Sequence, residues 1–133
     1  MADKLTHIRQ SLKDSVSDFS ISILIDISLF DPQIQDVIRN GQIQKFEVTM
    51  ELLWKSLKVF LFEMHGIIAS SPKQVIRSAF DIDFLTVKEA DKLLDGIDIR
   101  NQLSHIYKKS MFDEVYPEAV SYESIFTIVS ERI

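Results

Sequence analysis

The stretch from residue 46 to residue 64, FEVTMELLWKSLKVFLFEM, has the most regular apolar pattern in the chain. Glu51 and Lys55 form a favourable i,i+4 pair within it, and Gly66 supplies a C-terminal stop. The stretch therefore predicts an amphipathic helix with one buried face. Its apolar residues recur at the three- and four-residue steps of such a face: Phe46, Met50, Leu53, Trp54, Leu57, Phe60, Leu61 and Met64.

Two starting points for this helix are open. Asp31-Pro32 has the pattern of an N-cap followed by the first helical residue, which would begin the helix well before Phe46. Asn40-Gly41 lies between the two and is a typical break.

Two further helices are predicted after Gly66. Ser71-Pro72 reads as an N-cap and first residue of a short helix that reaches Phe80. The segment from Thr86 to Glu89 fits a capping box, which opens a helix that should reach about Tyr107. Gly96 lies inside this second helix, where glycine costs stability.

The two ends of the chain are also expected to be helical. A last helix should begin near Pro117. Near the N-terminus, apolar residues have helical spacing up to Val16, whereas the isoleucines from Ile21 to Ile27 alternate as in a strand. One strand without a partner cannot form a sheet, so residues 3 to about 28 are expected to be helical. The fold prediction is a single all-α domain over residues 1–133, an antiparallel up-down bundle of four or five helices.

The composition narrows the functional classes. The absence of cysteine rules out disulfides and thiolate metal sites, and it fits a cytoplasmic protein. No apolar run approaches the roughly 20 residues that span a bilayer, so we expect a soluble protein with no membrane partner. A net charge of −5 over 133 residues works against a broad nucleic-acid-binding surface but is compatible with a local basic site.

Common cofactor and metal motifs are missing. The sequence has no Walker loop, GxGxxG, HExxH, GxSxG or EF-hand pattern, and its three histidines lie far apart. Asp81 and Asp83 resemble a two-metal carboxylate pair, but such a pair in a turn between helices is usually solvated. We expect neither a metal nor a cofactor.

The segment from Arg100 to Tyr107 is the best candidate for chemistry. Residues 99–111 contain no carboxylate, although the chain as a whole is acidic. A guanidinium holds phosphate, an imidazole exchanges protons near neutral pH, and a phenol accepts a nucleotidyl group. The spacing also fits a structural reading, in which Tyr107 is half-buried, His105 satisfies a helix end and Arg100 is solvated.

Three blocks of sequence resemble the nucleotidyltransferase substrate-binding protein family. Residues 43–58, IQKFEVTMELLWKSLK, resemble its IQ-[RK]-FE…E-L-x-W-K-x-L-K signature. Residues 71–80, SPKQVIRSAF, are similar to its SPRxVIRxAF segment, and residues 100–107, RNQLSHIY, to its RNxxSHxY segment. The family belongs to the HEPN superfamily of helical bundles, which commonly dimerise and often carry an R-x(4-6)-H motif at the dimer cleft.

The resemblance implies a function and a set of site residues. It implies a homodimeric, toxin-like component of a toxin-antitoxin pair that works with a minimal nucleotidyltransferase. Arg100 and His105 would then catalyse metal-independent RNA cleavage, and Tyr107 would be the residue that receives AMP. The candidates for binding nucleotide or RNA are Arg100, Asn101, Ser104 and Lys108.

Two other functions remain open. The chain could be a non-catalytic module that binds a nucleotide and presents it to the nucleotidyltransferase, or a bundle that only mediates assembly. Trp54 and Phe60 have the spacing of a buried stripe, and Glu47 and Lys55 read first as solvated surface. The family pattern alone makes the latter two candidates for a cleft.

The chain departs from the family pattern at three places. Lys92 stands where tryptophan is common, and Ile99 replaces an acidic residue. Lys108-Lys109 replaces an acidic continuation after the tyrosine. These changes should alter packing around the cleft without weakening its attraction for phosphate.

Overall fold

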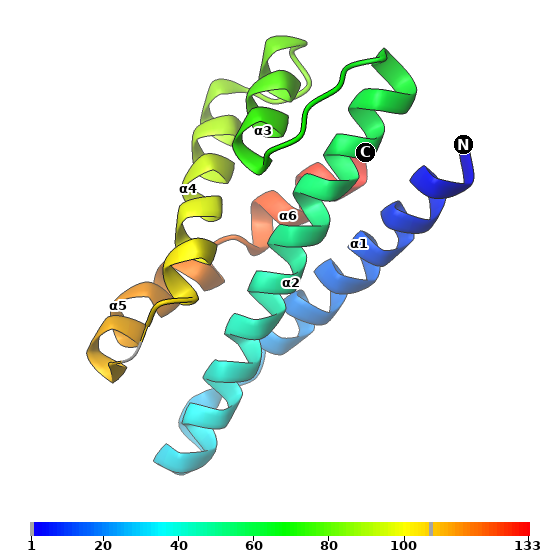
Figure 1. Ribbon diagram of the computed structural model, residues 1–133. Coiled ribbons are helices and arrows are strands. Elements are labelled where there is room, and N and C mark those ends of the chain that lie inside the picture. Colours follow the sequence, from blue (N-terminus) through cyan, green and yellow to red (C-terminus); the bar gives the residue numbers. More distant parts are fainter. Residues whose placement is uncertain (1, 107) are drawn as a thin grey trace.

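A computed structural model describes residues 2–106 and 108–133. Over these ranges the chain has six α-helices, one short 3-10 helix and no strand (Figure 1). The all-α bundle predicted from the sequence is confirmed. The helices are α1 (Ala2–Ile23), η1 (Ile27–Leu29), α2 (Pro32–His65), α3 (Pro72–Asp81), α4 (Val87–Leu103), α5 (Lys109–Val120) and α6 (Glu123–Arg132).

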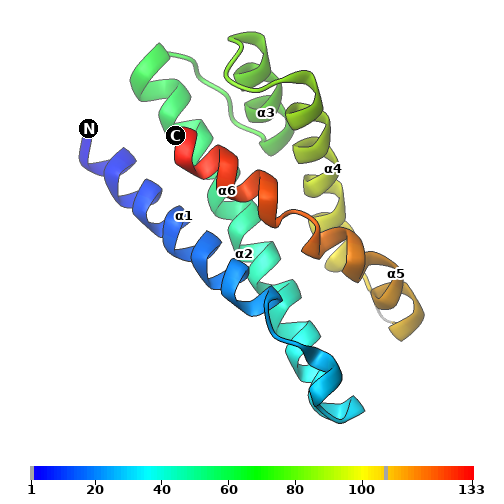
Figure 2. The ribbon, with the colours of Figure 1, turned by 180° about the vertical axis from the view of Figure 1, so that it is seen from behind.

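The bundle is built around α2. Helix α1 runs antiparallel along α2, while α3 and α4 lie on its other side (Figure 1). Seen from behind, α6 lies across α2 beside α1, and α5 packs against α2 and the end of α4 (Figure 2). None of the described helices is long and apolar enough to cross a membrane.

Helix α2 begins at the earlier of the two predicted starts. The Asp31 carboxylate accepts a hydrogen bond from the backbone N–H of Ile34 at 3.0 Å, and Pro32 occupies the first turn. Gly66 ends the helix in the left-handed region, with φ 66°. The helix continues through Gly41 because the residues that follow, Gln42 onward, are buried, and this packing offsets the roughly 1 kcal/mol that an interior glycine costs.

The caps of α3 and α4 are those predicted. The Ser71 side chain accepts a hydrogen bond from the backbone of Gln74, and Pro72 follows as the first helical residue. Thr86 and Glu89 form the reciprocal capping box, with distances of 3.1 and 2.9 Å. Both signals lie within four residues, so they act whatever the rest of the chain does.

Three helix boundaries differ from the predictions. Helix α1 ends at Ile23 rather than near residue 28, and α4 ends at Leu103 rather than Tyr107. After Leu103, the N–H groups of Ser104 and His105 bond three residues back, which tightens the chain into a turn. The expected helix start at Pro117 is wrong: this proline lies near the end of α5. The chain turns after Val120 and begins α6 at Glu123, which places Tyr122 in the core.

Four aromatic rings join three of these segments in the core. Phe46 of α2 lies 6.4 Å from Phe19 of α1, 5.8 Å from Phe126 of α6 and 5.3 Å from Tyr122, between ring centroids. All four are almost completely buried. A Cβ added at Gly96 would lie 2.8 Å from the Tyr122 ring, so this close approach explains the glycine inside α4.

Two of the family departures have a structural account. The Lys92 ammonium lies 4.1 Å from the centroid of the Tyr122 ring and 2.9 Å from the Ser121 hydroxyl, so lysine covers this ring. Burial of Tyr122 raises its pKa, and its hydroxyl donates to the backbone carbonyl of Lys92. Ile99 is buried, which an acidic residue would not tolerate without a partner.

Candidate functional site

Arg100 reaches from the last turn of α4 to α2. Its Nη2 lies 3.3 Å from a carboxylate oxygen of Glu51, and its Nε donates to the backbone carbonyl of Glu47 at 3.4 Å. The side chain is about one-third exposed. A cation in this position also interacts favourably with the C-terminal end of the helix dipole. The guanidinium is therefore held in place but is still accessible.

Glu51 connects Arg100 to two other residues of the family signature. One oxygen, Oε2, accepts from Trp54 Nε1 at 3.1 Å, and the other lies 3.1 Å from the Lys55 ammonium. Partial burial on its own would raise the pKa of Glu51, but hydrogen bonds from Trp54 and Lys55 and the charge of Arg100 together lower it. Glu51 is thus a carboxylate at neutral pH and neutralises Arg100 in part.

Glu47 is the second acidic neighbour of Arg100. Its burial raises its pKa, and the positive charge of Arg100 offsets this only in part. The expectation of a solvated Glu47 is wrong, because its side chain is partly buried, whereas Lys55 is exposed as expected. Sequence spacing gave no sign of a Glu51–Arg100 pair; the only available signal was the presence of both residues in the family pattern.

The remaining candidates lie on the segment between α4 and α5. Asn101, Ser104, His105 and Lys108 are all exposed. Within the described residues, the structure gives His105 no side-chain hydrogen bond or ion pair and no contact with Arg100. Tyr107 lies outside the described residues.

The start of α5 is fixed to the first half of α2. Lys109 lies 3.7 Å from the Asp36 carboxylate, and the Tyr116 hydroxyl donates to the side chain of Gln42. Arg39 of α2 lies 6.0 Å from the Tyr116 ring. The carboxylate-free segment of the sequence therefore packs beside acidic positions of α2, which supply its counter-charges.

The aspartates considered as a metal pair do not form a metal centre. Asp81 ends α3, and Asp83 follows in the turn before α4 with φ 62°; both are exposed. Throughout the part of the chain that the structure describes, no group of three or more His, Cys, Asp and Glu side chains is placed to hold a metal ion.

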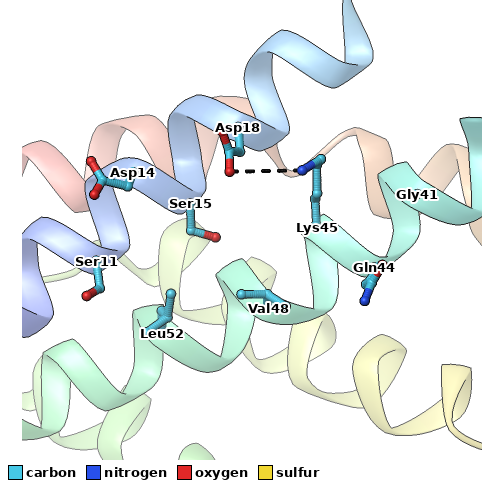
Figure 3. A pocket seen from close by; sticks show the side chains of 9 residues that line it. All are labelled: Ser11, Asp14, Ser15, Asp18, Gly41, Gln44, Lys45, Val48 and Leu52. Atoms are coloured by element: carbon cyan, nitrogen blue, oxygen red, sulfur yellow. Dashed lines mark ion pairs between the residues drawn. The ribbon is translucent and has the colours of Figure 1, made fainter.

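A groove of about 570 Å³ between α1 and α2 is separate from these residues. Its lining includes Asp14, Ser15 and Gln44, and Asp18 and Lys45 face each other across it at 3.9 Å (Figure 3). None of the candidate residues on the segment 100–108 lines this groove. It carries a carboxylate excess, which makes it a poor site for a phosphate.

Comparisons with known proteins agree with the resemblance noted in the sequence. Residues 4–133 match the family described as nucleotidyltransferase substrate binding protein like. A crystal structure of a protein from Thermus thermophilus superposes with a TM-score of 0.80 at 28% sequence identity, covering 91% of this chain and 97% of that one. The search of curated proteins found no match. Because the family match spans nearly the whole chain, this protein belongs to the nucleotidyltransferase substrate binding protein-like family.

Proposed function

We propose that this chain is the partner of a minimal nucleotidyltransferase and that Arg100 and His105 give it metal-independent ribonuclease chemistry. The family description supports the partner role. The observation that supports the chemistry is the position of Arg100, whose guanidinium is held 3.3 Å from Glu51 at the end of α4. His105 lies exposed five residues later. A positioned phosphate-binding cation and an accessible imidazole thus share one short segment.

Arg100 binds the scissile phosphate in this proposal. Its two hydrogen-bonding contacts in the structure use Nε and Nη2, and a guanidinium has five N–H donors. The remaining donors are available to a phosphate oxygen without breaking the contact with α2. The ion pair with Glu51 keeps the guanidinium oriented before RNA arrives.

His105 acts as the general base. It accepts the proton of a ribose 2′-hydroxyl while the 2′-oxygen attacks the adjacent phosphorus. The O2′–P bond forms, the P–O5′ bond breaks, and the 5′-oxygen takes a proton from water. The products are a 2′,3′-cyclic phosphate and a 5′-hydroxyl, and no metal takes part. Arg100 stabilises the charge that accumulates on the phosphate oxygens.

Tyr107 is the control point of the proposed pair. The nucleotidyltransferase transfers AMP from ATP to the phenol oxygen: the bond between the α- and β-phosphates breaks, pyrophosphate leaves, and the phenol proton goes to water. The attached AMP adds a bulky anion to the segment that also carries Arg100 and Lys108. It would oppose RNA binding by charge and by volume.

The proposed working form is a homodimer. Large apolar side chains are exposed where α1 turns into α2, among them Leu24 (81% exposed), Leu29 (78%) and Val37 (70%). Such a patch supports self-association, because its burial removes apolar surface from water. Light scattering should therefore give about twice the chain mass of 15.4 kDa; a mass of one chain at micromolar concentration would argue against a dimer.

The direct test is RNA cleavage in EDTA, before and after incubation with the nucleotidyltransferase and ATP. We expect the untreated protein to cut single-stranded RNA to 2′,3′-cyclic phosphate ends, and to leave the same oligonucleotide intact when every ribose is 2′-deoxy. After incubation, intact mass should rise by AMP and cleavage should fall, and neither should change in Tyr107→Phe. RNA that stays uncut, or cleavage that depends on a metal, would overturn the ribonuclease proposal.

A second candidate function is presentation of a nucleotide to the nucleotidyltransferase without cleavage. Glu47 and Glu51 beside Arg100 favour it, because two acidic side chains repel a long polyanion more than a single phosphate group. Here the added chain would raise the activity of the nucleotidyltransferase, and Arg100→Ala would remove that rise. Purified proteins that neither bind nor activate each other would contradict this role.

A further inference from the structure

A second groove lies at the end of the bundle that holds the chain termini. It has a volume of about 490 Å³ and is formed by the start of α1, the last turns of α2 and the segment that joins α2 to α3. Its floor and walls include Ile8, Trp54, Val59 and Phe62. This volume is in the range of small-molecule sites.

The groove leaves apolar surface in contact with water. Ile68 is 79% exposed and Phe62 57% exposed, and both line it. Side chains of this size gain free energy when a ligand removes them from water. The lining is thus suited to an aromatic or aliphatic body rather than to a bare inorganic ion.

The rim of the groove is basic although the chain is acidic. Lys4, Lys55 and Lys58 line it against one carboxylate, that of Glu63. Lys55 is paired with Glu51, but among the described residues Lys4 and Lys58 have no carboxylate within ion-pair distance. Two unpaired ammonium groups beside apolar surface complement a ligand that has an anionic head on an apolar body.

We propose that this groove binds an amphipathic organic phosphate, with its apolar body against Trp54 and Phe62 and its phosphate between Lys4 and Lys58. A nucleoside monophosphate and an alkyl phosphate share this chemistry. The proposal does not rest on the cleavage chemistry, since neither Arg100 nor His105 lines the groove. It does place a ligand next to the candidate site, because Trp54 also donates to the Glu51 carboxylate that holds Arg100.

Trp54 makes the groove directly observable, since it is the only tryptophan in the chain. The probe is 8-anilinonaphthalene-1-sulfonate, which has an aromatic body and an anionic head. We expect saturable binding at one site per chain, with energy transfer from Trp54 to the probe. Decyl phosphate or AMP should displace it, and the tighter of the two identifies the body that the groove prefers.

Charge-reversal variants provide the control. Lys4→Glu with Lys58→Glu should weaken binding of the probe and of the displacing phosphate by about tenfold or more, with an unchanged melting temperature. Lys13→Glu with Lys88→Glu makes the same change in net charge on exposed lysines outside the groove and should leave binding unaltered.

Three results would overturn the proposal. The first is equal binding by both double variants. The second is displacement by inorganic phosphate at the same concentrations as decyl phosphate, since the apolar body would then be irrelevant. The third is displacement by uncharged decanol as effectively as by decyl phosphate, since the anionic head would then be irrelevant. Loss of RNA cleavage without loss of probe binding would separate this site from the proposed ribonuclease.

Discussion

Phe46→Ala is expected to lower the free energy of unfolding by about 3–5 kcal/mol, the usual cost of removing a fully buried phenylalanine from a core. Phe46 is completely buried and its ring contacts those of Phe19, Tyr122 and Phe126. These rings come from α1, the α5–α6 turn and α6, so the alanine leaves a cavity that no single helix can close. Urea denaturation followed by circular dichroism measures the effect.

Phe62→Ala is the matched control for this prediction. Phe62 lies on the same helix, but its side chain is 57% exposed. Its truncation should cost about 0.5 kcal/mol or less, as is usual for exposed positions. The slope of unfolding free energy against urea should stay the same in both variants, so that the midpoints can be compared. Equal losses for the two variants would mean that the four-ring cluster is not the centre of the core.

The helices that the sequence predicted well are those with local signals. Asp31-Pro32, Ser71-Pro72 and Thr86 each set a helix start through contacts within four residues, and all three starts agree with the structure. The repeated apolar face of α2 likewise indicated its burial, because its period depends only on helix geometry.

The boundaries that failed depend on contacts far along the chain. The division between α5 and α6 follows from the burial of Tyr122, whose ring packs against Gly96 and Phe46. Nothing near Pro117 encodes those contacts, and a proline near the start of an apolar stretch is ordinarily a helix start. Sequence spacing also treated Gly96 as a cost, whereas the close approach of Tyr122 requires it.

The candidate site shows the same division. Arg100 was identified from a short motif, but the partners that hold it, Glu47 and Glu51, lie about fifty residues earlier on α2. The pattern of surface charges on α2 gave no reason to pair them with one arginine rather than with solvent. Trp54 was assigned to the core, yet its indole N–H meets Glu51 and its ring lines a groove. These roles arise from the packing of α4 on α2.

Arg100→Ala and His105→Ala are expected to lower kcat/KM for RNA cleavage by about 10²–10⁴-fold each, the range for losing a positioned proton-transfer group or a stabiliser of developing charge. The two losses should differ in kind. Arg100 contacts the phosphate in the ground state as well, so its variant should also raise KM. His105 acts only on the proton, so its variant should lower kcat with little change in KM.

Two further variants separate chemistry from folding. Arg100→Lys keeps the charge but loses the planar fork that binds two phosphate oxygens together, so its activity should lie between those of the native protein and Arg100→Ala. His7→Ala removes an exposed histidine on α1 and should leave cleavage unchanged. Light scattering should give the same mass for all variants, because none of these side chains lies in the core. If Arg100→Ala and His105→Ala both cut RNA at the native rate, the cleavage belongs to other residues, and nucleotide presentation becomes the better account of the Glu51–Arg100 pair.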